Sequence, residues 1–151
     1  MGVLRQEIDS MIRAIYLLQA SVRRRRELLD ASAQGAMWKR ENGKGRLTDA
    51  EMVGLAGSLH GWTKSVYQFG CSFIHLSRYH DYPDTDPLSI ISDADRTSIL
   101  QHMRKYHQGP SSDRPSFDEL ASYFPGVLRK IRANLEHYLL DLEKLVGLGR
   151  P

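Results

Sequence analysis

Apolar residues recur at alternating steps of three and four positions in two long stretches of the chain. This spacing places them on one face of an α-helix. The first stretch predicts a single amphipathic helix over residues 3–33, with an apolar stripe formed by Leu4, Ile8, Met11, Ile15, Leu18, Val22 and Leu29. Gly35, Gly43 and Gly45 interrupt the pattern, so residues 34–47 are predicted to form a loop.

The second stretch begins with a helix start signal. Thr48 is followed three residues later by Glu51, which is the spacing of a capping box. The pattern after it predicts one helix that continues to about Asp81, with a seam formed by Met52, Leu55, Leu59, Trp62, Val66, Phe69, Phe73, Leu76 and His80. Prolines within residues 81–91 then predict an acidic turn, because a residue before proline avoids helical backbone.

The capping pattern occurs twice more in the second half of the chain. Ser92 with Asp95 predicts a helix that ends near residues 106–109, and Ser116 with Glu119 predicts a short helical segment.

A last long helix is predicted over residues 127–146, after Pro125 interrupts the short segment. Its seam consists of Leu128, Ile131, Leu135, Tyr138, Leu142 and Leu145. Strand signals are absent from the sequence. Together these elements predict an all-α fold, an antiparallel bundle of four main helices plus a short helical segment.

The composition suits one domain over residues 1–151. With 151 residues, of which 41% are hydrophobic and 26% charged, the chain can build one core. No apolar run approaches the roughly 18 residues that span a bilayer, and charged residues occur too early for a signal peptide, so we expect a cytoplasmic protein. The single cysteine, Cys71, excludes an intrachain disulfide, and we expect a buried thiol.

Positive charge is concentrated near the N-terminus. Residues 1–48 carry ten Lys or Arg against five Asp or Glu, whereas the whole chain has a net charge of only +3. Arginines with an exposed tryptophan suit a single-stranded nucleic acid, because guanidinium groups neutralise phosphates and indole stacks on bases. The candidate nucleic-acid-binding residues are Arg23, Arg24, Arg26, Trp38, Lys39, Arg40, Lys44 and Arg46. The alternative is a solvated helix end followed by a flexible loop.

Other chemistries fit the sequence poorly. His75 and His80 are five residues apart, whereas two metal ligands on one helix prefer a spacing of three or four. The glycines of residues 41–46 precede no Lys-Ser or Lys-Thr pair, so a nucleotide phosphate loop is not predicted. We therefore expect neither a metal nor a cofactor.

The end of the second predicted helix is the most distinctive candidate site. Residues 73–82 place His75, Arg78 and His80 among two tyrosines, directly after the apolar seam. Imidazoles beside a guanidinium can transfer protons and hold a phosphate. Proximity of His107, at the end of the third helix, would strengthen this interpretation.

Residues 73–82 are similar to a helix end in degenerate HEPN-like proteins of bacterial defence and toxin-antitoxin systems. HEPN proteins are small all-α domains that often dimerise, and an Arg followed after four to six residues by a His forms their metal-independent ribonuclease site. The resemblance implies that His80 acts as acid or base, while His75 or Arg78 holds the phosphate. Two other stretches match the Arg to His spacing: Arg96 to His102, and Arg132 to His137.

Two functions follow from these observations. The first is a HEPN-like endoribonuclease or toxin acting as a homodimer, with His75, Arg78 and His80 as catalytic residues and Arg132 with His137 as the alternative pair. The second is a non-catalytic helical subunit that binds RNA or single-stranded nucleic acid, or assembles with a partner protein. The second predicts binding that weakens steeply with salt and does not depend on His80.

Overall fold

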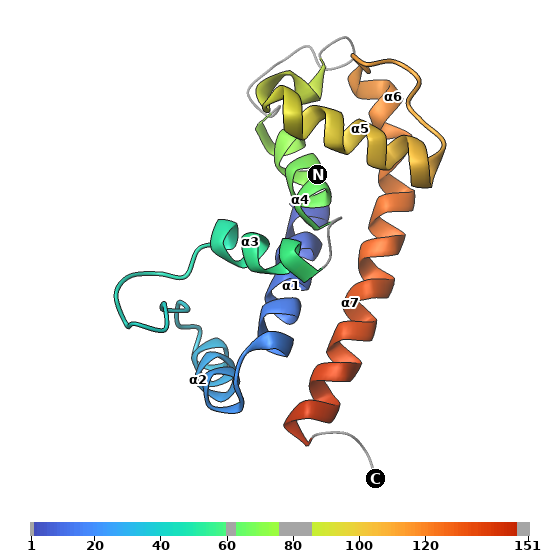
Figure 1. The fold of residues 1–151 in the computed structure, drawn as a ribbon. Helices are drawn as coiled ribbons and strands as arrows, with labels where there is room; N and C mark the ends of the chain where they lie inside the picture. Colours follow the sequence, from blue (N-terminus) through green and yellow to red (C-terminus); the bar gives the residue numbers. More distant parts are fainter. Residues whose placement is uncertain (1, 60–62, 76–85, 148–151) are drawn as a thin grey trace.

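The computed structural model of the protein describes residues 2–59, 63–75 and 86–147. Within these ranges, the side chains of residues 2, 57–59 and 72–75 are not described. Every regular element in these ranges is helical (Figure 1). The elements are α1 Gly2–Gln19, α2 Val22–Ala33, α3 Asp49–Leu59, α4 Thr63–His75, the 3₁₀ helix η2 Pro87–Ile90, α5 Asp93–His107, α6 Phe117–Ala121 and α7 Phe124–Val146.

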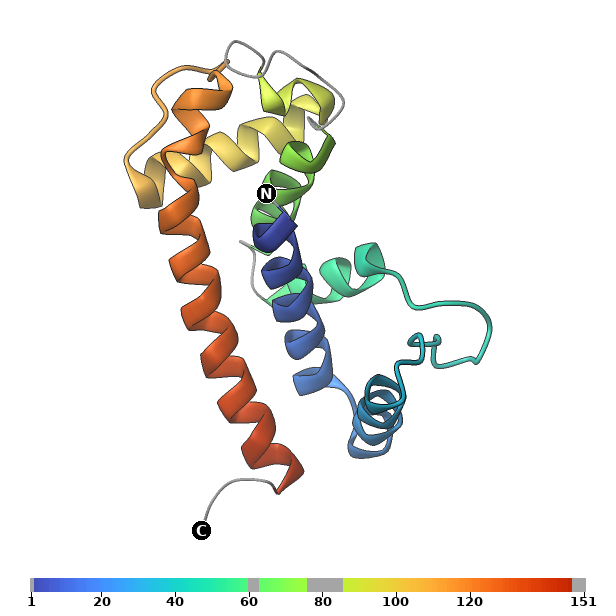
Figure 2. The same ribbon diagram turned by 180° about the vertical axis from the view of Figure 1, so that it is seen from behind.

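The predicted all-α helical bundle is confirmed. Figures 1 and 2 show α1 and α7 side by side and running in the same direction, while α4 runs against both and α5 crosses their upper ends. The expected antiparallel arrangement thus holds for α4 relative to α1 and α7. Ile8, Met11, Ile12 and Ile15 of α1 are fully buried, so α1 is the centre of the core. Within the described ranges, none of the helices has the length and apolar character to cross a membrane.

All three predicted capping pairs are confirmed. Thr48 accepts from the Glu51 amide at 3.3 Å, and the Glu51 carboxylate accepts from the Thr48 amide at 2.8 Å. Ser92 caps α5, and Ser116 with its glutamate partner forms a complete capping box at α6. These short-range hydrogen bonds satisfy amides that the first turn of a helix leaves free.

The prediction of one helix over residues 3–33 is wrong, because the chain breaks between α1 and α2. Ser21 stands at the break and caps α2, accepting a hydrogen bond from the Arg24 amide at 3.3 Å. Val22, which the apolar stripe included, is 78% exposed. The apolar residues keep their helical spacing in the sequence, but in the structure they no longer lie on one continuous buried face.

Arg25 stabilises this break. Its side chain is buried, with the residue only 7% exposed, and its guanidinium donates to three carbonyl oxygens at the end of α1. The distances are 2.8 Å to Leu17, 3.2 Å to Leu18 and 2.9 Å to Ala20. The final carbonyls of a helix have no hydrogen-bond donors within the helix. The buried Arg25 side chain therefore supplies the hydrogen bonds that a further turn of α1 would have supplied.

The second predicted helix is likewise divided. α3 ends at Leu59 and α4 begins at Thr63, and the two helices run in different directions in Figures 1 and 2. Met52 and Phe69 are buried as the seam predicts, whereas Leu55 is 48% exposed. The predicted continuation beyond His75 lies outside the described residues.

The contact between α1 and α4 is close at Gly70. A Cβ atom at Gly70 would lie 2.6 Å from Cδ1 of Ile8, so any other residue there would force the end of the buried Ile8 side chain to move. On the same contact, Arg5 donates to the Tyr67 hydroxyl at 2.8 Å and to the Cys71 sulfur at 2.7 Å. Cys71 is half-buried and accepts a hydrogen bond, so the expectation of a buried thiol is wrong.

We predict that Arg25→Ala lowers the free energy of unfolding by about 2–4 kcal/mol, because three buried carbonyls lose a charged donor. Arg26→Ala is the matched control, since Arg26 is the exposed neighbour on the same helix, and its effect should stay within about 0.5 kcal/mol. Urea denaturation of the three proteins measures both values. Equal effects of the two substitutions would contradict the role assigned to Arg25.

Candidate functional site

The first predicted site lies largely outside the described residues. His75 is the last residue of α4 and its side chain is not described, and neither is any part of Arg78 or His80.

The alternative pair occupies one helix but two environments. Arg132 and His137 are both exposed on α7. Nε2 of His137 lies 3.4 Å from a carboxylate oxygen of Asp141, whereas Arg132 lines a surface hollow with Glu7 of α1. Five residues apart on an ideal helix, the two side chains point about 140° apart. The described contacts do not bring them together.

The expectation of an exposed Trp38 is wrong. The residue is 8% exposed, its indole N–H donates to the Ser32 hydroxyl at 2.8 Å, and its ring lies 6.1 Å from that of Tyr16. Trp38 therefore fastens the loop to α1 and α2, and its ring face is not free to stack on a base.

Several of the predicted basic residues pair within the chain. Arg24 forms an ion pair with Glu27 at 3.2 Å and also donates to the carbonyl of Lys39. Arg40 hydrogen-bonds Glu51 at 2.6 Å and holds the pKa of that carboxyl at about 2, with the Thr48 hydrogen bonds adding to the effect.

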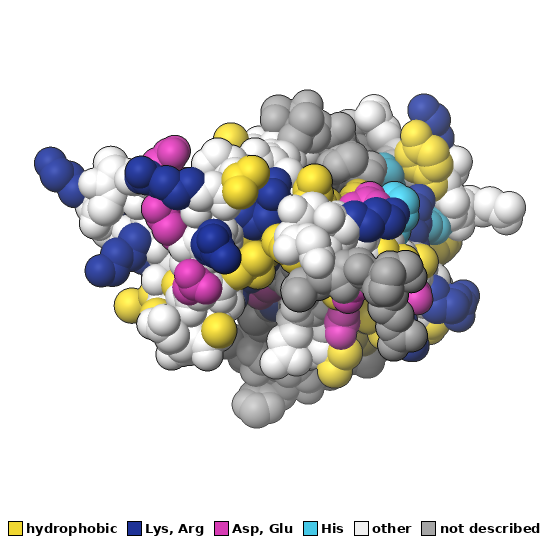
Figure 3. Space-filling model, turned by 90° about the horizontal axis from the view of Figure 1, so that it is seen from below, with side chains coloured by type: hydrophobic (Ala, Val, Ile, Leu, Met, Phe, Trp, Pro, Cys, Tyr) yellow, Lys and Arg dark blue, Asp and Glu magenta, His cyan; other side chains and the backbone are white. Residues whose placement is uncertain are grey.

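The remaining candidate residues are exposed to solvent. Arg23 is exposed although it forms an ion pair with Glu27. The other exposed candidates are Arg26, Lys39, Lys44 and Arg46. Lys and Arg side chains are visible over the end of the molecule that α2 and the loop form, at the left of Figure 3.

A different group of side chains converges between α5 and α7. The rings of His102 and Tyr106 are 4.7 Å apart, and those of His102 and His107 are 6.1 Å apart. Lys105 and Lys130 approach the Tyr106 ring at 5.2 Å and 5.3 Å. We call these five residues the α5–α7 cluster. Histidines gather beside Lys and Arg side chains toward the right of Figure 3.

Two adjoining hollows surround the cluster. An open one of about 530 Å³ is lined by four members of the cluster, all but His107, together with Ser65, Ser98 and Gln101. A narrow apolar one of about 30 Å³ lies against His102, His107 and Lys130. Ser65 of α4 reaches both, and its hydroxyl lies 3.0 Å from that of Ser98. His102 therefore has one apolar side and one side that solvent or a ligand can reach, whereas His107 lines only the narrow hollow.

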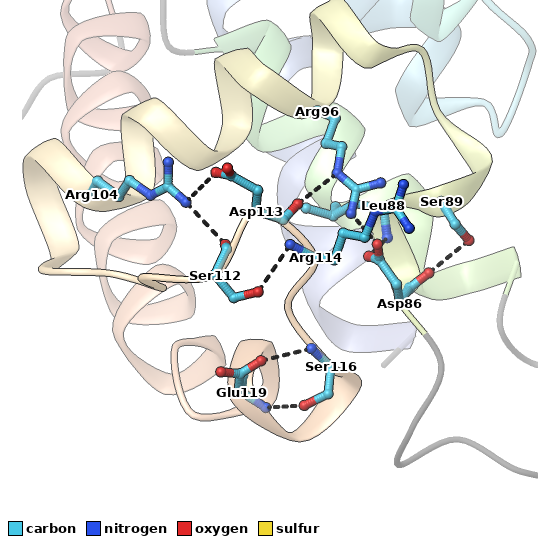
Figure 4. Close-up of polar contacts among 10 residues, drawn as sticks. All are labelled: Asp86, Leu88, Ser89, Arg96, Arg104, Ser112, Asp113, Arg114, Ser116 and Glu119. Atoms are coloured by element: carbon cyan, nitrogen blue, oxygen red, sulfur yellow. Dashed lines mark hydrogen bonds and ion pairs between the residues drawn. The ribbon is translucent and has the colours of Figure 1, made fainter.

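The end of α5 is held in place by the loop that follows it. Gln108 adopts left-handed backbone, with φ 64°, and terminates the helix directly after His107. Arg104 then donates to the carbonyls of Pro110, Ser111 and Ser112 at 2.8–3.1 Å, and to Asp113 at 2.7 Å. Figure 4 shows the bonds to Ser112 and Asp113. This network gives His107 a defined position although it ends a helix.

The surroundings lower the pKa of both imidazoles. For His102 the causes are burial first, then the positive charge of Lys130, then His107 and Lys105. For His107 they are burial and then Lys130. Both rings are consequently neutral at pH 7, with a nitrogen lone pair available to accept a proton.

Arg96 does not join His102, although the spacing of the two matches the HEPN pattern. Its guanidinium forms an ion pair with Asp86 and donates to the carbonyl of Asp113 at 3.0 Å (Figure 4). Arg96 therefore connects η2, α5 and the loop before α6, and its charge is already compensated.

The cluster is distant from the backbone of His75. Ser65, in the first turns of α4, lines the hollows, and ten residues of helix separate it from His75, which is about 15 Å of rise.

Apolar periodicity in the sequence could not identify the α5–α7 cluster, because Lys130 belongs to another helix than the histidines. The available signal was the dense set of His, Tyr and Lys residues in the last two turns of α5.

No group of His, Cys, Asp or Glu side chains with the geometry to hold a metal occurs in the ranges that the structure describes. The chain matches no protein-family model, no curated protein and no solved structure.

We predict that Lys130→Gln raises the pKa of both His102 and His107, whereas Lys105→Gln raises only that of His102, because Lys105 acts on that ring alone. NMR titration of the imidazole protons measures each value. Since both folded-state pKa values lie below the ordinary 6.5, the unfolded chain binds protons more readily. The free energy of unfolding should therefore decrease as the pH falls below 6.5, and less so in Lys130→Gln. Unchanged imidazole pKa values in Lys130→Gln would contradict the geometry of the cluster.

Proposed function

We propose that the protein is a HEPN-like endoribonuclease that works without a metal, and that the α5–α7 cluster is its active site. What supports the proposal is one arrangement: two neutral imidazoles whose rings are 6.1 Å apart, beside Lys130. Imidazoles transfer protons near neutral pH, and an adjacent ammonium group attracts the phosphate of an RNA chain.

The reaction we propose is transfer of the phosphoryl group to the neighbouring 2′-oxygen. His102, the imidazole that lines the open hollow, accepts the proton of the ribose 2′-hydroxyl as the 2′-oxygen bonds to phosphorus. The bond from phosphorus to the 5′-oxygen breaks, and His107 in its protonated form donates a proton to that oxygen. The products are a 2′,3′-cyclic phosphate and a 5′-hydroxyl end.

The other members of the cluster have supporting roles. The ammonium groups of Lys130 and Lys105 stabilise the negative charge that develops on the phosphoryl oxygens. Tyr106 is 54% exposed and can stack on a base of single-stranded RNA. The HEPN resemblance would place such an enzyme in the cytoplasm, in a bacterial defence or toxin-antitoxin system.

The second candidate function is a non-catalytic subunit that binds nucleic acid or joins a larger complex. The observation that favours it is the exposed group Arg23, Arg26, Lys39, Lys44 and Arg46 around α2 and the loop. These cations would contact phosphates, and the buried Trp38 leaves them without an aromatic platform there. This function requires no contribution from His102 or His107.

A homodimer is the assembly that we propose. On α7, Arg132, Leu139 and Glu143 lie on one stripe beside a hollow of about 450 Å³, and Leu135, Glu136, Leu140 and Glu7 of α1 complete its lining. Leu139 and Leu140 are about half exposed. If two copies pack α7 antiparallel about residues 137 and 138, Arg132 faces Glu143 of the second copy and leucines meet between them.

We predict that the wild type cuts end-labelled single-stranded RNA in the presence of a chelator, and that His102→Gln and His107→Gln each slow cutting at least about 100-fold. The rate should fall on both sides of an optimum below pH 6.5, since one imidazole must be neutral and the other protonated. Gel separation of the fragments, with detection of the cyclic phosphate end, measures the reaction.

His137→Gln is the matched control for this assay, because His137 is an exposed histidine outside the cluster. Loss of cutting only in His80→Ala would move the site to residues 73–82, and loss only in Arg132→Ala would move it to α7. Salt-sensitive RNA binding without cutting would support the non-catalytic subunit instead.

For the dimer, we predict that Leu139→Asp produces a monomer, because a carboxylate would be buried at the centre of the contact. Leu145→Asp, an exposed leucine of α7 outside the hollow, should leave the mass unchanged. Arg132→Glu should weaken the dimer, and adding Glu143→Arg should restore it. Light scattering after size-exclusion chromatography measures the mass, and a monomeric wild type would refute the assembly.

A further inference from the structure

A second hollow, separate from the α5–α7 cluster, lies where α1, α2 and the loop of residues 34–47 meet. Its volume is about 300 Å³, within the range of small-molecule sites. Two arginines line it, Arg13 from α1 and Arg46 from the loop. The rest of its lining is Ser32, Gly35, Ala36, Met37, Trp38, Leu47 and Met52, which includes no carboxylate.

The walls of this hollow are built before any ligand arrives. The carbonyl of Trp38 accepts from the Leu47 amide at 2.8 Å, and the Arg40 amide donates to the carbonyl of Gly45 at 3.1 Å. An isolated β-bridge pairs Lys39 with Arg46. These contacts fix the backbone that carries Arg46, and the bond from Trp38 to Ser32 fixes the aromatic wall. A ligand therefore meets ordered groups and does not have to order them.

The guanidinium of Arg13 retains capacity for a ligand. It lies 5.6 Å from the Trp38 ring, and one terminal nitrogen is 3.8 Å from a carboxylate oxygen of Asp49. A guanidinium has five N–H donors, and one long ion pair leaves most of them free. Asp49 divides its charge between Arg13 and Arg5, and Glu51 binds Arg40.

We propose that this hollow binds a small organic phosphate. Two guanidinium groups approaching from different elements suit a doubly charged phosphate monoester, because each can donate in parallel to two of its oxygens. The volume exceeds what one phosphate fills, and Met37, Leu47 and Met52 supply apolar surface for the organic part. The size and lining fit a mononucleotide.

Isothermal titration calorimetry at fixed ionic strength tests this proposal, with 5′-AMP, adenosine and inorganic phosphate as probes. The wild type should bind 5′-AMP with one-to-one saturation and bind the other two at least about tenfold more weakly. Arg46→Gln and Arg13→Gln should each weaken 5′-AMP binding at least about tenfold, because each removes a charged donor. Lys44→Gln is the matched control from the same loop, outside the hollow, and should change affinity less than about twofold.

Each alternative outcome overturns the proposal. No saturable binding of 5′-AMP, equal binding of adenosine, or equal binding of inorganic phosphate would exclude an organic phosphate as the ligand. Equal weakening in Lys44→Gln would show unspecific attraction to a basic surface. Thermal unfolding of each variant confirms that it is folded. Because His102→Gln should bind 5′-AMP like the wild type, failure here leaves RNA cleavage at the other site untouched, and the reverse also holds.

Discussion

Burial of α1 is the constraint on which the rest of the structure depends. This helix contacts α2, α3, α4 and α7, and Ile8, Met11 and Ile12 have no exposed surface. The faces of α1 that meet these helices must be apolar, because a polar residue there would lose its water, while Gln6, Ser10 and Arg13 occupy the exposed face. Where α1 ends at Gln19, Arg25 supplies the hydrogen bonds that its last carbonyls need. The cost of burying a charge is offset by three hydrogen bonds to carbonyl oxygens.

Helix starts marked by a capping pair could be predicted from the sequence, while breaks within the long predicted helices could not. A cap such as Ser116 with Glu119 is a contact over three residues, so its signal is contained in the local sequence. The break at Ser21 depends on Arg25 folding back onto α1, and the residues around it, including Leu18 and Leu29, keep the helical period. Apolar periodicity records which residues prefer burial and carries no information on whether the backbone between them turns.

The candidate site, too, could be predicted from the sequence only in part. The basic character of α2 and the loop was visible in the composition, but the burial of Trp38 depends on Ser32 and Tyr16 and could not be read from the aromatic residue itself. The α5–α7 cluster joins His102 to Lys130, across 28 positions of sequence, and nothing in the local pattern of either helix records that approach. Residues 73–82 stand out in the sequence, and they remain the comparison against which the cluster has to be tested.

The same packing that buries α1 also sets the geometry of the cluster. Lys130 is followed by Ile131, which is buried in the core shared with α1, so the register of α7 against α1 decides where the Lys130 ammonium group lies relative to the imidazoles. Asn134, one turn further along α7, lines the same narrow cavity as His102. A change in the core at Ile131 should therefore alter the pKa of His102 without touching it, because the Coulombic effect of Lys130 depends on distance. The packing of α7 therefore affects both the stability of the fold and the pKa of the imidazole proposed to transfer a proton.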